Sequence, residues 1–74
     1  MKRLSNLPEG DEGRVRRVEG SDEISLRLME MGLTPGTSVR LLGTAPLGDP
    51  LELELRGYRL SVRRSEAARV ELEQ

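Results

Sequence analysis

Apolar and polar residues alternate most regularly in the C-terminal half of the chain. From Leu51 to Arg56 every second residue is leucine and the residues between are charged, the period of a strand with one buried face. Leu60 and Val62 continue the alternation in a second run. Gly57-Tyr58, between the two runs, fits a tight hairpin turn with glycine at positive φ. The pattern predicts a β-hairpin.

Three further segments have weaker strand patterns. Ser38–Thr44 alternates, and Arg69–Glu73 closes the chain with two apolar residues facing inward. In Gly13–Val18 the valines Val15 and Val18 are three residues apart, which is out of step with a strand. This spacing indicates either a β-bulge or a partly exposed face.

One segment, Asp22–Met31, has the apolar spacing of an amphipathic helix. Ile24, Leu28 and Met31 form a single stripe, which we expect to cover one end of the sheet. Ser21 is the predicted N-cap, and the two acidic residues that follow suit the helix dipole.

The helix end and the connecting segments follow from glycine and proline. Gly32 and Leu33 fit a Schellman motif, and Thr34–Thr37 fits a type II turn. Leu4–Gly10 is predicted to be an extended entry arm, and Ala45–Pro50 a loop. Ser65–Ala68 is predicted to form a single helical turn.

These elements give the order strand, helix, three strands, a short turn and a final strand. We therefore predict a mainly β protein: a small, strongly bent antiparallel barrel of about five strands, with one short helix after the first strand. The 74 residues are expected to form a single domain spanning positions 1–74.

Composition excludes several classes of function. The chain has no cysteine and no histidine, which removes thiolate and imidazole from metal binding and from acid–base catalysis. We expect no enzyme activity, no cofactor and no tight metal site, although the carboxylates around Glu9–Glu12 can bind hard cations weakly. With 12 basic and 13 acidic residues, the chain is not expected to bind nucleic acid. It has no apolar run of membrane-spanning length and no secretory signal, so we expect a cytoplasmic protein.

The remaining type of function is binding to a partner, and the loop Ala45–Pro50 is the first candidate. Its prolines limit its freedom, so Leu47 at its centre is a candidate anchor, flanked by Pro46 and Asp49. The alternative is that Leu47 folds back over the sheet.

Three further residues are candidates for partner binding. Met29 lies off the helix stripe and suits either an adaptable contact surface or the edge of the core. Arg59 and Arg63 share one strand face, where they can meet acidic groups of a partner or lipid headgroups. The alternative is that they form cross-strand ion pairs with Glu52 and Glu54.

Three stretches of the chain resemble the FeoA family, the small ferrous iron transport protein A. They are Arg27–Thr37, Ala45–Pro50 and Arg56–Ala67, and the arm Leu4–Gly10 also fits the family's opening. The resemblance implies an SH3-like barrel and a cytosolic accessory role beside FeoB, a membrane transporter with a GTP-binding domain. Tyr58 is the only aromatic residue, so an aromatic groove for polyproline is not expected.

The resemblance leaves three hypotheses about function. The first is an accessory protein of ferrous iron uptake that binds and modulates a FeoB-type transporter. The second is a metal-responsive regulatory module, because a similar barrel ends the iron-dependent repressors of the DtxR type; without a winged helix upstream, no DNA binding is expected. The third is a homo-oligomer formed through an unpaired sheet edge.

Overall fold

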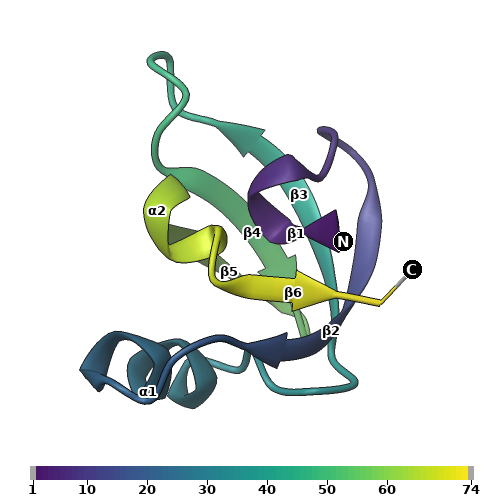
Figure 1. Ribbon diagram of the computed structural model, residues 1–74. Helices are drawn as coiled ribbons and strands as arrows, with labels where there is room; N and C mark the ends of the chain where they lie inside the picture. The colour runs from purple at the N-terminus through teal and green to yellow at the C-terminus, as the bar shows by residue number, and fades with distance from the viewer. Residues whose placement is uncertain (1, 74) are drawn as a thin grey trace.

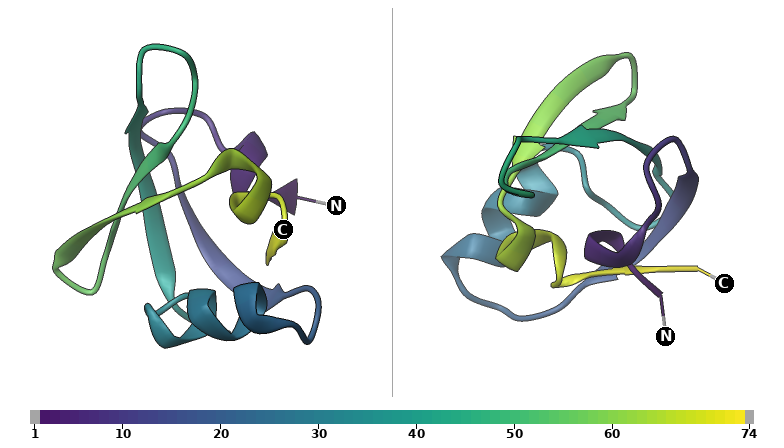
Figure 2. Two further views of the ribbon diagram at one scale, coloured as in Figure 1. Left: turned by 90° about the vertical axis from the view of Figure 1, so that its left-hand side faces the viewer. Right: turned by 90° about the horizontal axis from the view of Figure 1, so that it is seen from above.

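Six strands form one antiparallel sheet in the computed structural model, which describes residues 2–73 (Figure 1). Their order across the sheet is β1-β6-β2-β3-β4-β5. The strands are β1 (Lys2–Arg3), β2 (Glu12–Val18), β3 (Ser38–Thr44), β4 (Leu51–Leu55), β5 (Tyr58–Val62) and β6 (Val70–Leu72). The sheet is strongly bent and encloses the core (Figure 2).

Three short helical segments connect the strands: the 3-10 turn η1 (Leu4–Asn6), α1 (Glu23–Glu30) and α2 (Arg64–Ala67). Helix α1 covers one end of the sheet, and α2 lies beside η1 (Figure 1). Among the residues described, no helix combines the length and the apolar character needed to cross a bilayer.

The predicted fold class is confirmed, with two differences in detail. There are six strands instead of about five because Lys2 and Arg3 pair with Leu72 and Glu71, so α1 follows the second strand. Two residues are too few to show a strand period, which is why the pattern did not predict β1. The sheet is also open, since the outermost strands β1 and β5 do not pair.

Helix α1 begins at Glu23, one residue later than predicted. The N-cap is Asp22, not Ser21, and its Oδ1 accepts a hydrogen bond from the Ser25 backbone N–H at 3.2 Å. Both residue types are good caps, so composition alone did not distinguish them.

The predicted end of α1 is confirmed. The Gly32 N–H donates to the Met29 carbonyl at 3.0 Å, and the Leu33 N–H donates to the Leu28 carbonyl at 3.1 Å. These are the two bonds of a Schellman motif, and the φ of +113° at Gly32 explains why glycine is needed there. The chain then makes the predicted turn over Thr34–Thr37.

The core lies inside the bend of the sheet and is almost entirely aliphatic. Within the predicted stripe, Leu28 is fully buried, and Ile24 and Met31 pack against the core at its margin. The predicted extended arm is wrong in part, because Leu4 begins a 3-10 turn and both Leu4 and Leu7 are buried. Two leucines separated by polar residues gave no regular period that would have revealed this.

The irregular spacing in β2 is a bulge. The pairing of β2 with β6 shifts register between Val15 and Arg17, so Val15 and Val18 both reach the core. The β4–β5 turn lies one residue earlier than predicted, at Arg56 and Gly57, with φ of +50° and +82°. These are the angles of a two-residue type I′ turn, and Tyr58 is the first residue of β5.

One charged side chain is buried in the sheet. Glu71 in β6 is 2% exposed and accepts a hydrogen bond from Arg17 Nε at 3.0 Å, with Arg16 Nε at 3.6 Å. Alternation along β6 predicted that Glu71 points away from the core, and the covering arginines explain how a residue in that position loses its contact with water. The two guanidinium groups compensate the buried charge.

We expect stability to fall in acid partly through two ion pairs, Arg69–Asp22 and Arg3–Glu19. The hydrogen bond from Arg69, at 2.6 Å, and the Ser25 N–H lower the pKa of Asp22 below its ordinary 3.8; Arg3 lowers the pKa of Glu19 below its ordinary 4.5. Because both pKa values are lowered in the folded state, the stabilisation is present above the ordinary values and is lost as pH falls through the lowered ones.

The measurement is the melting temperature between about pH 5 and about pH 2. The double variant Asp22→Asn with Glu19→Gln, which keeps a good N-cap, should show a shallower fall than the parent protein. Glu54→Gln is the control, since the Glu54 carboxylate makes no ion pair within residues 2–73. Parallel curves for parent and double variant would contradict the assignment.

Candidate docking surface

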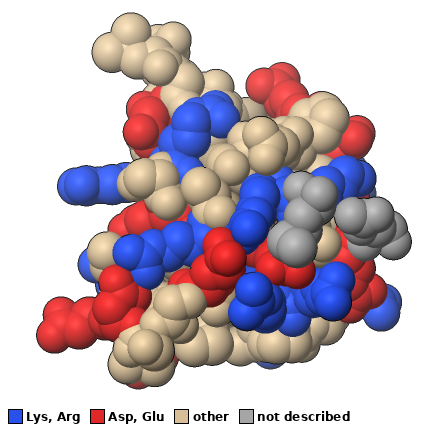
Figure 3. All heavy atoms as spheres, in the orientation of Figure 1, with Lys and Arg blue, Asp and Glu red and all other residues tan. Residues whose placement is uncertain are grey.

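The loop between β3 and β4 projects from the sheet and carries the most exposed large apolar residue described. Leu47 at its tip is 96% exposed, so it does not fold back over the sheet. The Gly48 N–H donates to the Ala45 carbonyl at 2.7 Å, and the Ala45 N–H donates to the Pro50 carbonyl at 3.0 Å, which closes the loop at its base. In Figure 3 the tip forms an uncharged projection at the upper left, whereas charges of both signs are interspersed over the rest of this face.

Arg64 of α2 fixes the base of this loop. Its backbone N–H donates to Asp49 Oδ1 at 3.0 Å, and its Nε donates to the Gly48 carbonyl at 3.0 Å. Its Nη1 donates to the Ser5 carbonyl at 2.9 Å, which connects the loop to η1. A loop held in this way loses little conformational entropy when a partner covers its tip.

The structure distinguishes the three loop residues predicted to bind a partner. Pro46 is exposed beside Leu47 and belongs to the tip. Asp49 is exposed too, but one of its carboxylate oxygens supports the loop from within through Arg64. The sequence did not predict this role of Asp49, because the partner lies 15 residues further along the chain.

The other predicted contact residues lie elsewhere. Met29 is half-buried and packs against the core on α1, at the end of the molecule opposite the loop (Figure 1). Arg59 is exposed on β5, in register with Glu54 on β4, yet the two make no ion pair within 4.0 Å. The expected ion pairs of Arg59 and Arg63 with the acidic residues of β4 are therefore not formed among the described residues. Glu52 accepts a hydrogen bond from the Ser61 hydroxyl instead, at 2.7 Å.

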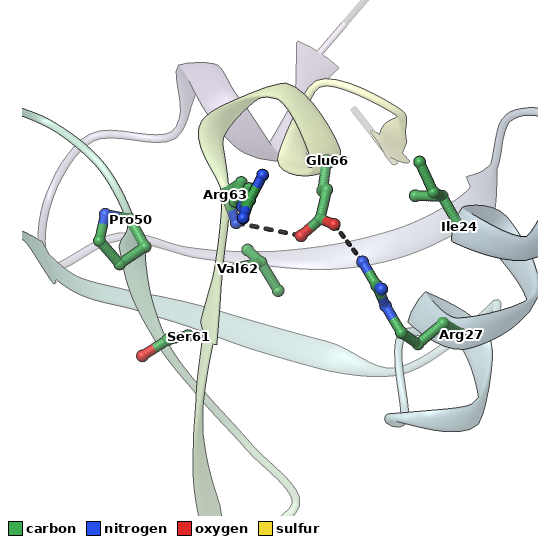
Figure 4. A pocket seen from close by; sticks show the side chains of 7 residues that line it. All are labelled: Ile24, Arg27, Pro50, Ser61, Val62, Arg63 and Glu66. Atoms are coloured by element: carbon green, nitrogen blue, oxygen red, sulfur yellow. Dashed lines mark hydrogen bonds and ion pairs between the residues drawn. The ribbon is translucent and has the colours of Figure 1, made fainter.

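A groove of about 500 Å³ lies between α1, β5 and α2. Figure 4 shows Arg27 of α1 reaching Glu66 of α2 across it, and the second oxygen of Glu66 accepts the Arg63 backbone N–H at 3.2 Å. The groove is lined by Ile24, Arg27, Pro50, Ser61, Val62, Arg63 and Glu66. Of these, the sequence predicted a contact role only for Arg63. No local signal could have shown the others, because Arg27 and Glu66 meet across 39 residues.

The β3–β4 loop and the groove both offer groups that can contact a partner. The loop tip offers an apolar side chain, and the groove lining includes two guanidinium groups and three apolar residues, Ile24, Pro50 and Val62. Among residues 2–73, no three acidic side chains come together to hold a metal ion, and this includes the stretch Glu9–Glu12.

Three relatives show what this chain is similar to. It is 39% identical over 71 residues to a Fe(2+) transport protein A/Fe(2+) transporter FeoB fusion protein of Porphyromonas gingivalis; the match covers 96% of this chain but only 8% of that protein. Among solved structures it is similar to FeoA of Stenotrophomonas maltophilia complexed with zinc (34% identity, TM-score 0.86, 99% and 91% of the two chains). It is also similar to iron(II) transport protein A of Clostridium thermocellum (35% identity, TM-score 0.91, 97% and 44% of the two chains).

The Stenotrophomonas protein is described as an SH3 domain protein, and this similarity confirms the predicted SH3-like fold. Part of a manganese-dependent transcriptional repressor has the same fold, at 16% identity and a TM-score of 0.87 over 97% of this chain and 35% of the repressor. That likeness concerns the fold alone. The family model described as FeoA domain matches residues 2–74, and the chain therefore belongs to the FeoA family.

Proposed function

We propose that this chain is an accessory protein of ferrous iron uptake that binds the cytosolic part of a FeoB-type transporter and alters its activity. The observation that carries the proposal is the Porphyromonas gingivalis relative, in which a segment 39% identical to this chain belongs to the same polypeptide as the transporter. Two proteins that act together are often joined in this way. Such a fusion supports a direct association between a domain of this family and the transporter.

The β3–β4 loop supports binding of this kind. It places Leu47, 96% exposed, at the tip of a loop whose base is fixed by Arg64. A single apolar anchor that enters a partner's pocket is a common source of binding energy at protein interfaces. Arg59 and Arg63 are exposed arginines that assist at the rim, where charge mainly speeds and orients association.

The proposed effect on the transporter is conformational, not chemical. The chain has neither histidine nor cysteine, and it presents an anchor and guanidinium groups in place of a nucleophile and a base. A binding protein of this kind changes its partner's activity only if it binds one conformation of the partner more tightly than another. GTP hydrolysis then belongs to the transporter.

Leu47→Asp is expected to weaken binding to the transporter about tenfold or more, because burial of a leucine side chain contributes about 1.5–3 kcal/mol. Binding of the parent and variant chains is measured against the purified transporter and against its cytosolic domain. Leu26→Asp is the matched control, since Leu26 is 54% exposed on α1 and lies at the other end of the molecule from the loop.

Three results would count against the proposal in different ways. If Leu47→Asp binds as tightly as the parent chain, the loop is not the anchor. If the parent chain itself binds neither the transporter nor its cytosolic domain, the partner is wrong. Equal losses for Leu47→Asp and Leu26→Asp would indicate a general effect of added charge and would also remove the assignment to the loop.

A further inference from the structure

The outer edge of β5 is the one long strand edge of the sheet left open among residues 2–73. β5 ends the sheet on one side, and its five residues pair with β4 in continuous register, without a bulge. The opposite edge, β1, has only two residues. Proteins usually protect such edges with charged side chains, proline, a bulge or a covering segment, because an open edge can pair with another chain. Strand β5 contains one charged residue, Arg59, and no proline or bulge.

The register identifies the backbone groups that point outward. Leu55 and Tyr58 flank a two-residue turn and therefore form a hydrogen-bonded pair. Hydrogen-bonded pairs recur at every second residue, so Leu60 and Val62 also bond to β4 through their backbones. The N–H and C=O groups of Arg59 and Ser61, which lie between them, are therefore directed away from β4. These groups are suited to pair with a further strand.

The groove lies beside this part of the edge. Helix α1 is tied to β5 at one end of the strand, where Tyr58 Oη donates to the Met31 carbonyl. Toward the other end the groove separates them, with Ile24 and Val62 as apolar contacts and Ser61 at its margin (Figure 4). The volume of about 500 Å³ provides space for side chains of a segment paired with β5.

The charges around the edge indicate the character of the occupant. Arg59 and Arg63 form no ion pair within the described residues, and the groove contains Arg27 as a third guanidinium. Glu66 is the only acidic residue of the groove lining. Arg27 is 56% exposed and bonds Glu66, which is 13% exposed, through one guanidinium nitrogen. Its other N–H groups can therefore meet a second carboxylate while this pair stays formed. An acidic segment complements this rim.

A second copy of this chain fits less well. Antiparallel pairing of two β5 strands about Leu60 would place the two Arg59 side chains diagonally on one face, about 7–8 Å apart. It would also leave Arg63 of each copy without a carboxylate.

From the open edge, the adjoining groove and the unpaired arginines, we infer that β5 binds an acidic segment of a partner protein in extended conformation. The segment adds a seventh strand to the sheet through the backbone of Arg59 and Ser61, and its carboxylates meet Arg63 and Arg27. This mode of recognition gains affinity from main-chain hydrogen bonds and specificity from side chains. It uses the backbone edge of β5 and the groove, not the tip of the Leu47 loop, and it shares Arg59 and Arg63 with the rim proposed above for the transporter.

The test uses a blocked synthetic hexapeptide in which glutamate and valine alternate. Its titration into the protein is followed by NMR and by amide hydrogen exchange. We expect saturable binding, with slower exchange at the Arg59 and Ser61 amides. The same peptide with lysine in place of glutamate should bind at least about tenfold more weakly, because like charges then meet at the rim. A version methylated on every backbone nitrogen should not bind.

Two protein variants separate backbone pairing from side-chain contact. Ser61→Pro removes the outward N–H and the side-chain hydroxyl but keeps the backbone hydrogen bonds between β5 and β4, which proline permits only on an edge strand. Ser61→Ala removes the hydroxyl, and with it the bond to Glu52, but keeps the N–H. We expect Ser61→Pro to bind the glutamate peptide at least about tenfold more weakly than Ser61→Ala.

Several outcomes would overturn the inference. Equal binding of the glutamate peptide by the two Ser61 variants would exclude pairing through the backbone. If Ser61→Pro does not fold, the same conclusion would follow from equal binding of the methylated and unmethylated peptides to the parent protein. Equal binding of the glutamate and lysine peptides would exclude an acidic ligand. Protection of Ser61 that rises with protein concentration alone would assign the edge to a second copy. Absence of saturable binding at millimolar glutamate peptide would exclude the site.

Discussion

Replacement of Leu53 with alanine is expected to lower the free energy of unfolding by about 2–5 kcal/mol. Leu53 is 0% exposed in β4, in register with Leu41 of β3 on one side and Leu60 of β5 on the other. Leu53 is packed inside the bend of the sheet, so the removed atoms leave a cavity that the neighbouring strands cannot fill by a small shift. The loss is large compared with the stability of about 4–11 kcal/mol that a chain of this length has.

Urea denaturation of the parent and two variants measures this loss. Leu53→Val removes a single methylene and should cost about 1 kcal/mol, which keeps the series measurable even if Leu53→Ala does not fold. The control is Glu54→Ala, whose exposed side chain lies on the other face of the same strand and should change stability by less than about 0.5 kcal/mol. A loss for Leu53→Ala no larger than that of the control would mean that β4 is not central to the core.

Gly32→Ala is expected to cost about 2–3 kcal/mol, for two reasons that add. The φ of +113° at Gly32 is unfavourable for any residue with a Cβ, at about 1–2 kcal/mol. A Cβ at this position would also collide with Tyr58 Oη and lie 3.2 Å from Leu55 Cδ1. Tyr58 would have to move, and its hydrogen bond to the Met31 carbonyl would be lost at a further cost of about 1 kcal/mol.

Gly36→Ala separates the two contributions. Gly36 has a φ of +90°, but a Cβ built there meets no atom within 4 Å, so this variant experiences backbone strain alone. The effect of alanine on the unfolded chain is the same in both variants and cancels in the comparison. Gly32→Ala should therefore be the less stable of the two by urea denaturation, and the gap should shrink when Tyr58→Phe removes the colliding oxygen. Equal stabilities would show that α1 and the β4–β5 hairpin are not in contact at Gly32.

The parts of the fold that local chemistry determines were predictable from sequence. The alternation in β4 and β5 and the glycine at the end of α1 each depend on residues within a few positions of one another. The spacing of the two valines in β2 indicated either a bulge or a partly exposed face, and the structure shows the bulge.

The parts that depend on distant residues were not predictable. Strand β1 exists only because β6 lies beside it, and Glu71 is buried only because Arg16 and Arg17 cover it from another strand. In both cases the residues responsible, β6 for strand β1 and the two arginines for Glu71, lie far away in the sequence. The alternative of cross-strand ion pairs between Arg59 or Arg63 and Glu52 or Glu54 is not observed among the described residues, because register alone does not bring two long side chains together.

The candidate site shows the same division. The prolines and Leu47 identified the loop before its geometry was known, but the support from Arg64 joins residues 16 positions apart. The groove was missed because it is built from α1, β5 and α2 together. The docking role of Met29, Pro46, Leu47, Asp49, Arg59 and Arg63 remains a prediction for the binding measurements to decide.

The pairing of the first and last strands has a consequence for how this domain can be attached to other proteins. Lys2 lies opposite Leu72, so the two ends of the described chain are side by side, at one flank of the molecule between the level of the β3–β4 loop and that of α1 (Figure 1). A tether at either end therefore starts beside β1 and β6 and not at the loop tip. Because the ends are close, a short linker can join them. A circularly permuted chain can then begin and end in another loop while Leu47 keeps its place at the tip of the β3–β4 loop.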